Sequence, residues 1–295
     1  AKTMTKTLLS LGHGYSARAL ADLLVPMDWE IHGTTRSEEK AQTMQRQGVT
    51  APVLPKDGCI QVPAAWEHAT HLLISAGPDE QGDPMLRAFR PLLKRLAPKL
   101  KWAGYLSTTG VYGEPDGAWE DGPTTLGPST RRGRRRVAAE SEWGNVAGLP
   151  LHIFRLAGIY GPERGPFAKV RSGTARRIIK PGQVFSRIHV EDIAQVLAAS
   201  IARPNPGAIY NLCDDDPAPP QMVIAHAAQL LGLPLPPEED FETAQMTPMA
   251  RSFYSESKRV RNERIKSELG VQLKYPSYRE GLADLLAREE NPKDQ

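Results

Sequence analysis

The chain has 295 residues, 40% of them hydrophobic, which is enough to bury one large core or a domain with an added lobe. Its 37 basic and 34 acidic residues give a net charge of +3, too balanced to indicate a nucleic-acid partner. No apolar run approaches the ~20 residues that a membrane-spanning helix needs. Cys59 and Cys213 lie far apart without metal-ligand spacing, so we expect no metal site and a cytoplasmic protein.

The first 160 residues alternate short apolar runs with helix-like segments. Expected strands cover residues 7–11, 29–33, 49–54, 71–76, 104–108 and 151–156. Expected helices follow the first strand, begin at Pro84 with Asp83 as N-cap, and cover residues 135–145. Apolar runs of this kind, separated by helices, are typical of a parallel sheet covered on both faces. The sequence therefore predicts an α/β fold.

The pattern changes after Gly161, where Pro, Gly and Arg become more frequent. A clear amphipathic helix is expected over residues 190–201, followed by a strand over 208–212. Further helices are expected from 220 to 231, at about 257–269 and at about 277–285.

A glycine-rich turn joins the first strand to its helix. Gly12-His13-Gly14-Tyr15-Ser16-Ala17 fits the pattern G-x-G-x-x-A. The first Gly permits a tight turn, the second lets the backbone approach a pyrophosphate, and the small third residue allows close helix–strand packing. The strand before it and the helix after it favour a Rossmann-type, doubly wound dinucleotide-binding sheet over an ordinary turn.

The end of the second strand indicates which dinucleotide is bound. An NAD site places Asp or Glu about twenty residues after the glycines, and this chain has none there. Thr35, Arg36 and Ser37 instead offer a guanidinium and two hydroxyls, which suit a 2′-phosphate. We therefore expect NADP rather than NAD; the alternative is that Arg36 is a solvated surface charge.

The segment from Tyr105 to Gly113, YLSTTGVYG, with the acidic loop 114–121 after it, resembles the extended short-chain dehydrogenase/reductases, which include sugar epimerases and dehydratases. In that family a Ser or Thr at the position of Thr108 holds the reacting oxygen, and a Tyr-x-x-x-Lys supplies the acid/base. Here Arg132 and Arg136 occupy the Tyr and Lys positions. The family's usual first glycine also falls on Leu11, so the turn departs from the family pattern.

The resemblance implies further cofactor contacts and a domain layout. Leu54, the small residues Ser75-Ala76-Gly77 and the segment Ala157-Gly158-Ile159 match positions that line the cofactor. Residues 1–161 are expected to form the NAD(P)-binding domain. Residues 162–295 are expected to form mainly a small substrate lobe, with about 183–213 returning to the first domain. The resemblance is greatest to an atypical branch, described loosely as NAD-dependent epimerase/dehydratases, in which the Tyr-x-x-x-Lys is poorly kept.

Arginine cannot replace the tyrosine as a proton donor, because its pKa exceeds 12. Arg136 is a candidate to hold the ribose and Arg132 a candidate to bind an anionic substrate group. Among other groups, Asp83 joins Thr108 and the two arginines as a candidate catalytic residue, although a helix cap is its alternative role. The remaining acid/base candidates, each with a structural alternative, are Tyr112, Glu114, Tyr160 and His189. Arg187, beside His189, is a candidate to reach a phosphate.

The run Arg131-Arg132-Gly133-Arg134-Arg135-Arg136 is the densest charge cluster of the chain. It lacks the interleaved aromatic residues of a nucleic-acid patch. At a helix N-terminus these arginines oppose the macrodipole, which indicates an anionic neighbour, while a solvated basic face remains the alternative.

Two functions remain open from the sequence. The first is an NADP-binding oxidoreductase or epimerase acting on a small polar substrate, such as a nucleotide sugar or another anion. The second is a non-catalytic dinucleotide-binding or redox-sensing protein that has lost its acid/base. In either case we expect a monomer or homodimer that binds neither nucleic acid nor a membrane.

Overall fold

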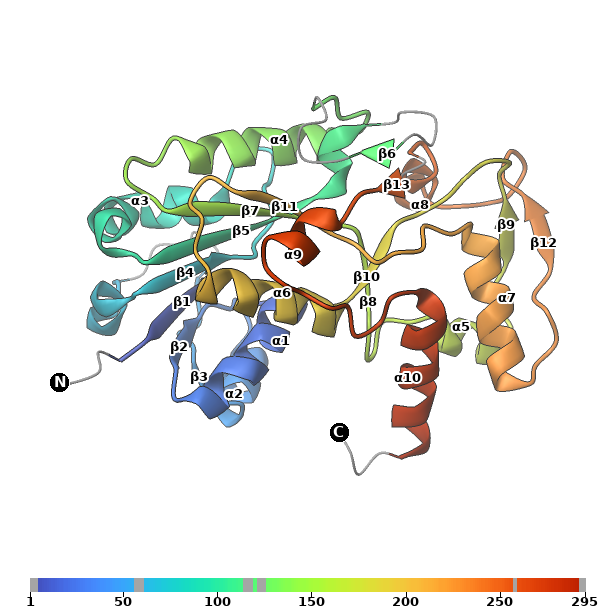
Figure 1. Ribbon diagram of the computed structural model, residues 1–295, viewed down its shortest axis with the longest axis horizontal. Helices are drawn as coiled ribbons and strands as arrows, with labels where there is room; N and C mark the ends of the chain where they lie inside the picture. Colours follow the sequence, from blue (N-terminus) through green and yellow to red (C-terminus); the bar gives the residue numbers. More distant parts are fainter. Residues whose placement is uncertain (1–4, 56–60, 114–118, 121–125, 257–258, 292–295) are drawn as a thin grey trace.

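The computed structural model describes residues 5–55, 61–113, 119–120, 126–256 and 259–291. Its centre is a sheet of seven parallel strands in the order β11-β7-β5-β4-β1-β2-β3 (Figure 1). The strands are β1 (Thr7–Leu11), β2 (Glu30–Gly33), β3 (Val49–Thr50), β4 (His71–Ile74), β5 (Trp102–Thr108), β7 (Leu151–Leu156) and β11 (Ile209–Leu212). The strand order reverses between β1 and β4, as in doubly wound sheets, so the predicted Rossmann-type fold is confirmed.

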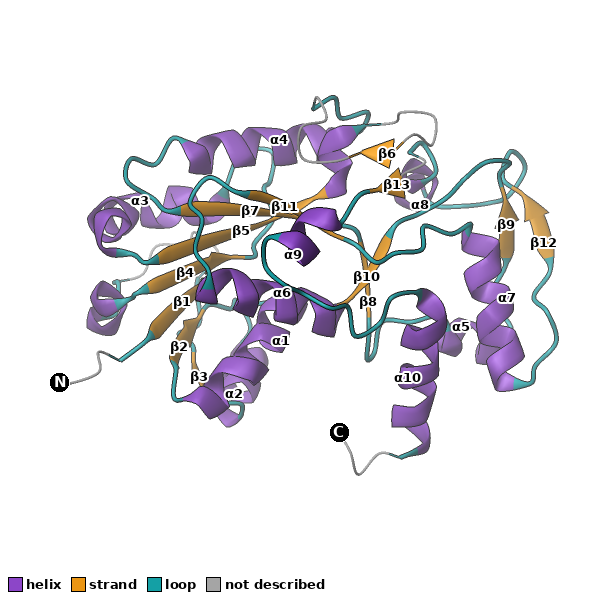
Figure 2. Cartoon of the chain, in the orientation of Figure 1, coloured by secondary structure: helices purple, strands orange, loops and turns teal. Residues whose placement is uncertain are grey.

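Helices cover both faces of this sheet (Figure 2). On one face lie α3 (Pro84–Leu96) and α4 (Arg131–Gly144), and on the other lie α1 (Tyr15–Leu24), α2 (Glu38–Arg46) and α6 (Val190–Ala202). Each face has its own buried apolar cluster, around Phe89 and Trp143 on the first face and around Leu20 and Ile193 on the second. Burial on both faces explains why the strands read as continuous apolar runs.

Six further elements form a lobe beside the carboxyl ends of the strands (Figure 1). It contains α5 (Phe167–Ser172), β9 (Arg177–Ile179), α7 (Pro220–Leu231), β12 (Glu238–Asp240), α8 (Pro248–Phe253) and α10 (Tyr278–Glu290). A third apolar cluster, around Phe167, Ala227 and Leu282, holds α5, α7 and α10 together. A parallel pair, β8 (Gly158–Tyr160) with β10 (Arg187–His189), lies between the sheet and the lobe.

Several element boundaries differ from the expectations. The third strand ends at Thr50, because Pro52 cannot donate to a ladder, although Thr35 and Val53 still form one bridge. Helix α4 begins at Arg131, since the Thr130 hydroxyl caps it by accepting from the Gly133 amide at 3.0 Å. The predicted helix over about 257–269 is wrong in extent: β13 (Arg259–Val260) pairs with β6 (Trp119–Glu120), and α9 covers Glu263–Ser267.

None of the helices within the described ranges combines the length and the apolar character needed to cross a membrane.

Candidate active site

The turn after β1 brings backbone segments into close approach. Gly12 has a φ of +77°, and a Cβ there would lie 2.5 Å from the Ala76 Cβ, so only glycine fits. Gly14 precedes α1, and a Cβ at this position would meet nothing closer than 3.7 Å. No side chain among the described residues caps α1. Its first amide groups are therefore open to an anion.

Two hydroxyls fix this turn. Thr34, at the end of β2, accepts from the Gly12 amide at 2.6 Å, and Ser75, after β4, donates to the Gly12 carbonyl. Ser75 is one of the positions expected near the cofactor, whereas the contact between Thr34 and the turn is not predicted from the sequence. A threonine after a strand carries no signal of a partner 22 residues away.

The other residues of the glycine motif point in different directions. His13 is buried with Nδ1 2.8 Å from the Ser10 hydroxyl, and burial, with a smaller effect of the Arg18 charge, lowers its pKa to about 4. Ser16 and Ala17 are buried on the side of α1 that packs on the sheet. Tyr15 donates to the Pro162 carbonyl at 2.6 Å. Gly12 and Gly14 thus form the turn before the uncapped start of α1, and the other residues of the motif make contacts inside the protein.

At the end of β2, three candidate cofactor residues lie in different environments. Ser37 caps α2 by accepting from the Lys40 amide at 3.2 Å, and its own amide donates to the Thr35 hydroxyl at 3.1 Å. The Thr35 carbonyl accepts from the amide of the buried Leu54 at 2.7 Å. Arg36 is exposed, and no described residue forms a hydrogen bond or an ion pair with it.

Thr108 ends β5, and the first turn of α4 packs beside it. The Thr108 hydroxyl accepts from the Gly110 amide at 3.1 Å. A Cβ at Gly133 would lie 2.6 Å from the Gly110 carbonyl, so glycine in the arginine run lets α4 touch the turn Thr109–Tyr112. This contact positions the two arginines that occupy the family's Tyr and Lys positions.

Those two arginines have different partners. Arg136 donates to the Leu106 carbonyl at 2.7 Å, and one of its terminal nitrogens lies 3.2 Å from the Cβ position of Gly77. It therefore joins β5 to the end of β4. Arg132 turns towards the lobe, where it donates to the Ser252 hydroxyl at 2.9 Å and lies over the ring of Phe253.

A cavity of about 1050 Å³ opens between the strand ends and the lobe. It brings together the candidate residues Thr108, Arg132, Ala157, Gly158 and Ile159. The amide of Gly158 donates to the Ser186 carbonyl at 3.1 Å, which joins this floor to β10. Within the described part of the chain, Asp83, Arg136 and the glycine turn are not among the lining residues.

Two of the acid/base candidates are engaged away from this cavity. Asp83 is fully buried, with one carboxylate oxygen accepting from the Met85 and Leu86 amides at 3.0 Å and the other from the Trp143 indole at 2.8 Å. The structure thus gives it the capping role. Tyr112 is buried and donates to Asn211 at 2.6 Å. Glu114 lies outside the described residues.

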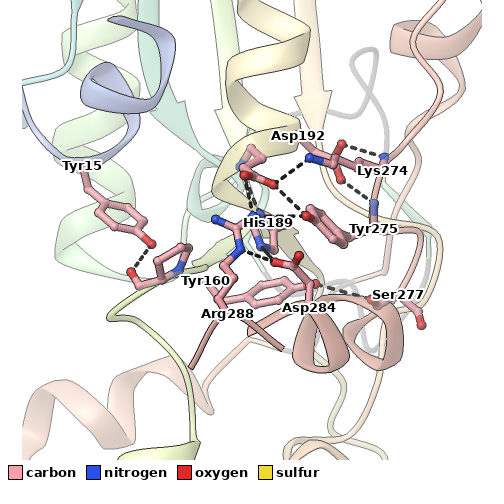
Figure 3. A network of polar contacts seen from close by, with 11 residues as sticks. Tyr15, Tyr160, His189, Asp192, Lys274, Tyr275, Ser277, Asp284 and Arg288 are labelled. Atoms are coloured by element: carbon pink, nitrogen blue, oxygen red, sulfur yellow. Dashed lines mark hydrogen bonds and ion pairs between the residues drawn. The ribbon is translucent and has the colours of Figure 1, made fainter. Parts of the chain in front are cut away.

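Tyr160 and His189 belong to a network that ties α6 to α10 (Figure 3). His189 caps α6 by accepting from the Glu191 amide at 3.1 Å, stacks on Tyr275 at 4.0 Å, and has its pKa lowered to about 4 by burial. Tyr160 lines the cavity, but its hydroxyl is directed to the Ser277 carbonyl at 3.4 Å, and burial raises its pKa.

His189, Glu191 and Asp284 offer ligand atoms within 4.8 Å of one another. Arg288 already pairs with Glu191 at 2.5 Å and with Asp284 at 2.7 Å, so this grouping is held by an internal cation.

The lobe contributes a wall that the sequence did not indicate as a unit. Arg176, Arg187, Tyr254 and Glu256 line the same cavity as Thr108. Of these, the sequence indicates only Arg187, as a candidate to reach a phosphate. Of the others, Arg176 precedes β9, Tyr254 is the C-cap of α8 and Glu256 follows that helix. These segments have no periodicity that marks them in the sequence.

No protein-family model matches the chain. Its structure is similar to that of a conserved protein of unknown function from Silicibacter pomeroyi, with 60% sequence identity, a TM-score of 0.92, and coverage of 96% of this chain and 99% of that one. Protein YeeZ of Escherichia coli K12 is 26% identical over 282 residues, covering 92% of this chain and 97% of YeeZ. A 3-diazoavenalumate denitrifying reductase of Streptomyces is 29% identical over 160 residues, about half of each chain.

More distant structures share the fold. A dTDP-glucose 4,6-dehydratase from Bacillus anthracis, in complex with NAD, has a TM-score of 0.74 at 15% identity and covers 98% of both chains. The human epimerase family protein SDR39U1, with NADPH, has a TM-score of 0.72 at 17% identity and covers 95% of this chain and 99% of its own. The predicted resemblance to the extended short-chain dehydrogenase/reductases is thereby confirmed at the level of fold.

Proposed function

Because the chain belongs to the same family as the conserved Silicibacter pomeroyi protein and has the fold of the extended short-chain dehydrogenases, we propose that it is an NADP-dependent oxidoreductase acting on a small polar anion. The observation that carries the proposal is the cavity of about 1050 Å³, which meets the ends of β5 and β7 at Thr108 and Leu156. Ligands of doubly wound sheets bind at this edge. In this proposal residues 1–161 hold the cofactor, residues 162–295 supply most of the substrate lobe, and about 183–213 return to the first domain.

The residues at the sheet edge fit a dinucleotide. The uncapped start of α1 and the open space at Gly14 suit a pyrophosphate. The guanidinium of Arg36, with which no described side chain pairs, suits a 2′-phosphate, and the hydroxyls of Thr35 and Ser37 lie beside it. Ala76, Gly77, Gly158 and Ile159 would hold the nicotinamide half. When bound, such a cofactor supplies or accepts a hydride.

Reduction of a carbonyl group also requires a proton, and Arg132, at the family's tyrosine position, cannot donate it. We assign it to the hydroxyl of Tyr254, which lines the cavity and has no hydrogen-bond partner among the described residues. Its ring is held between Phe185, at 5.3 Å, and Phe241, at 5.1 Å. Burial raises the pKa of Tyr254, and the charges of Arg176 and Arg187 act against that rise. A neutral phenol beside two cations is suited to donate to a substrate oxygen and then to be reprotonated by cavity water.

The test is NADPH oxidation with phenylglyoxylate and 9,10-phenanthrenequinone as carbonyl probes. Thr108→Val should lower kcat/KM by about 5- to 150-fold, since a neutral hydrogen bond in a closed site contributes on the order of 1–3 kcal/mol. Tyr254→Phe should lower it by about 100-fold or more, because general acid catalysis is typically of that size.

Tyr278→Phe is the matched control. Tyr278 also lies beside an arginine, with Arg279 4.7 Å from its ring centre, but it is not among the described residues that line this cavity. We expect its turnover to equal that of the unmodified protein. Turnover that is indifferent to Thr108→Val and Tyr254→Phe would remove both assignments. Tight NADPH binding without any turnover would favour the alternative of a non-catalytic dinucleotide-binding or redox-sensing protein.

A further inference from the structure

We infer that Arg187 binds an oxyanion of the substrate, a carboxylate or a phosphate, and that Phe185 and Tyr254 contact a flat apolar body attached to it. This inference rests on the proposed function and specifies its substrate class.

The guanidinium of Arg187 is only partly used by the protein. Its Nη1 donates to the carbonyls of Phe185, at 3.0 Å, and Ala218, at 3.2 Å. No described residue accepts a hydrogen bond from its Nε or Nη2, and no carboxylate within the described ranges lies within ion-pair distance of it. The side chain lines the cavity, so the unused edge is available to a ligand there. A guanidinium edge of this shape binds carboxylate or phosphate through two parallel hydrogen bonds.

Burial makes this charge costly without a partner. Desolvation lowers the pKa of Arg187, so the surroundings disfavour its charged form. Asp214 lies beside Arg187: its amide donates to the Arg187 carbonyl at 2.7 Å, and its carboxyl is near enough to act on the Arg187 guanidinium. Burial raises the pKa of Asp214 to about 8, and this group is therefore largely neutral at pH 7. Asp216 is committed to Arg279 at 2.8 Å. A bound anion would supply the missing negative charge.

The rest of the cavity wall favours the same ligand. Its described lining has four cationic side chains, Arg132, Lys169, Arg176 and Arg187, and one carboxylate, Glu256. Among the described residues, Arg176 alone of these four is paired with a carboxylate outside the lining, namely Glu239 at 2.8 Å. A cleft lined by mostly one sign of charge attracts ligands of the opposite sign.

Aromatic rings border the same guanidinium. The ring centres of Phe185 and Tyr254 are 5.3 Å apart in an edge-to-face arrangement, and the Arg187 guanidinium carbon is 6.0 Å from the Phe185 ring. Val223 and Ile224 of α7 add apolar lining. Flat apolar groups pack well on such rings.

Arg187 also lies next to the proposed reaction site. Its Cγ is 4.0 Å from the Cβ position of Gly158, in the strand paired with β10. An oxyanion held here would place the adjoining carbon atoms beside that strand. The favoured substrate is therefore a small aryl compound with its oxyanion close to the reacting carbon.

The test compares three probes by calorimetric titration of the full chain: phenylglyoxylate, phenyl phosphate and the uncharged methyl phenylglyoxylate. At least one anion should bind tenfold or more tightly than the ester, and the tighter anion distinguishes carboxylate from phosphate. Arg187→Gln should weaken the preferred anion by at least about tenfold and leave the ester unchanged, because a charge-assisted contact is lost. Arg171→Gln, which removes an exposed cation of α5 that is paired with Glu289, should leave all three affinities unchanged.

Equal affinity of the unmodified protein for anions and ester would overturn the inference, and this comparison does not depend on the folding of any variant. Equal anion binding by the unmodified protein and a folded Arg187→Gln variant would overturn it as well. A parallel titration with NADPH tests the proposed function separately. Anion binding without NADPH binding would keep the oxyanion site and remove the cofactor assignment.

Discussion

The guanidinium carbon of Arg132 lies 4.0 Å from the centre of the Phe253 ring, so that the residue at the family's tyrosine position contacts the lobe. Arg132 lies beside the central sheet, in the first turn of α4, and Phe253 ends α8. This pair closes one wall of the cavity, which both residues line. The position that carries the acid/base in the family therefore has a structural contact in this chain.

We predict that Arg132 and Phe253 are energetically coupled. In a double-mutant cycle of Arg132→Ala and Phe253→Ala, the coupling in unfolding free energy should be about 0.5–1 kcal/mol, the usual size for an exposed cation–π contact. Urea unfolding of the four proteins measures it. Strict additivity of the two single changes would show that the contact contributes nothing to closing the wall.

The two motif glycines should respond differently to alanine. Gly12→Ala places a Cβ 2.7 Å from the Ala76 amide nitrogen at a φ of +77°, so we expect a loss of about 1–3 kcal/mol in unfolding free energy. Gly14→Ala meets no close atom and should leave stability within about 0.5 kcal/mol. It should nevertheless weaken NADPH binding by about tenfold or more, because its methyl group enters the space proposed for the pyrophosphate. Undiminished NADPH binding by Gly14→Ala would remove the pyrophosphate from this turn.

Asp214 should make stability depend on pH. Burial raises its pKa to about 8 in the folded protein, so the folded state holds the proton more tightly than the unfolded state does. Its contribution to stability is then complete below about pH 4 and is lost as the pH rises towards 8. The Asp216 amide donates a hydrogen bond to the Asp214 carboxyl at 3.0 Å. The side chain of Asp214→Asn cannot ionise, but it keeps an oxygen that can accept this hydrogen bond.

The unfolding free energy of Asp214→Asn, relative to that of the unmodified protein, should therefore increase between pH 5 and pH 8 by about 1 kcal/mol or more. Urea unfolding at the two pH values, without added anions, measures this difference. An unchanged difference between the two proteins at both pH values would show that Asp214 is ionised in the folded state.

The sheet could be predicted from the sequence because its signals are local. Apolar runs such as Thr7–Leu11 and Leu151–Leu156 carry their own burial pattern, and Pro84 after Asp83 marks a helix start by chemistry within a few residues. The glycine motif also predicted its own geometry, since the φ of +77° at Gly12 is a conformation that glycine adopts readily.

The cavity wall could be predicted only in part, because its contacts join distant segments. Tyr254 meets Phe185 across 69 positions of the chain, and Arg132 meets Ser252 across 120. Neither pair has a periodicity or spacing that a single sequence reveals. For the same reason the role of Thr34 could not be predicted. Its hydroxyl accepts from the Gly12 amide, whereas its neighbour Thr35 is the residue expected at the cofactor.

The central claim, that the open edge of the sheet holds NADP, is tested most directly by equilibrium titration with NADPH and NADH. The comparison uses the unmodified protein, Arg36→Ala, and Arg46→Ala as a control in the last turn of α2, the helix that follows Arg36. We predict tighter binding of NADPH than of NADH. Arg36→Ala should weaken NADPH binding by about tenfold or more, the loss expected for one charge-assisted contact, and should leave NADH binding unchanged. Arg46→Ala should leave the binding of both cofactors unchanged. Equal losses for both cofactors, or tighter binding of NADH by the unmodified protein, would contradict the account.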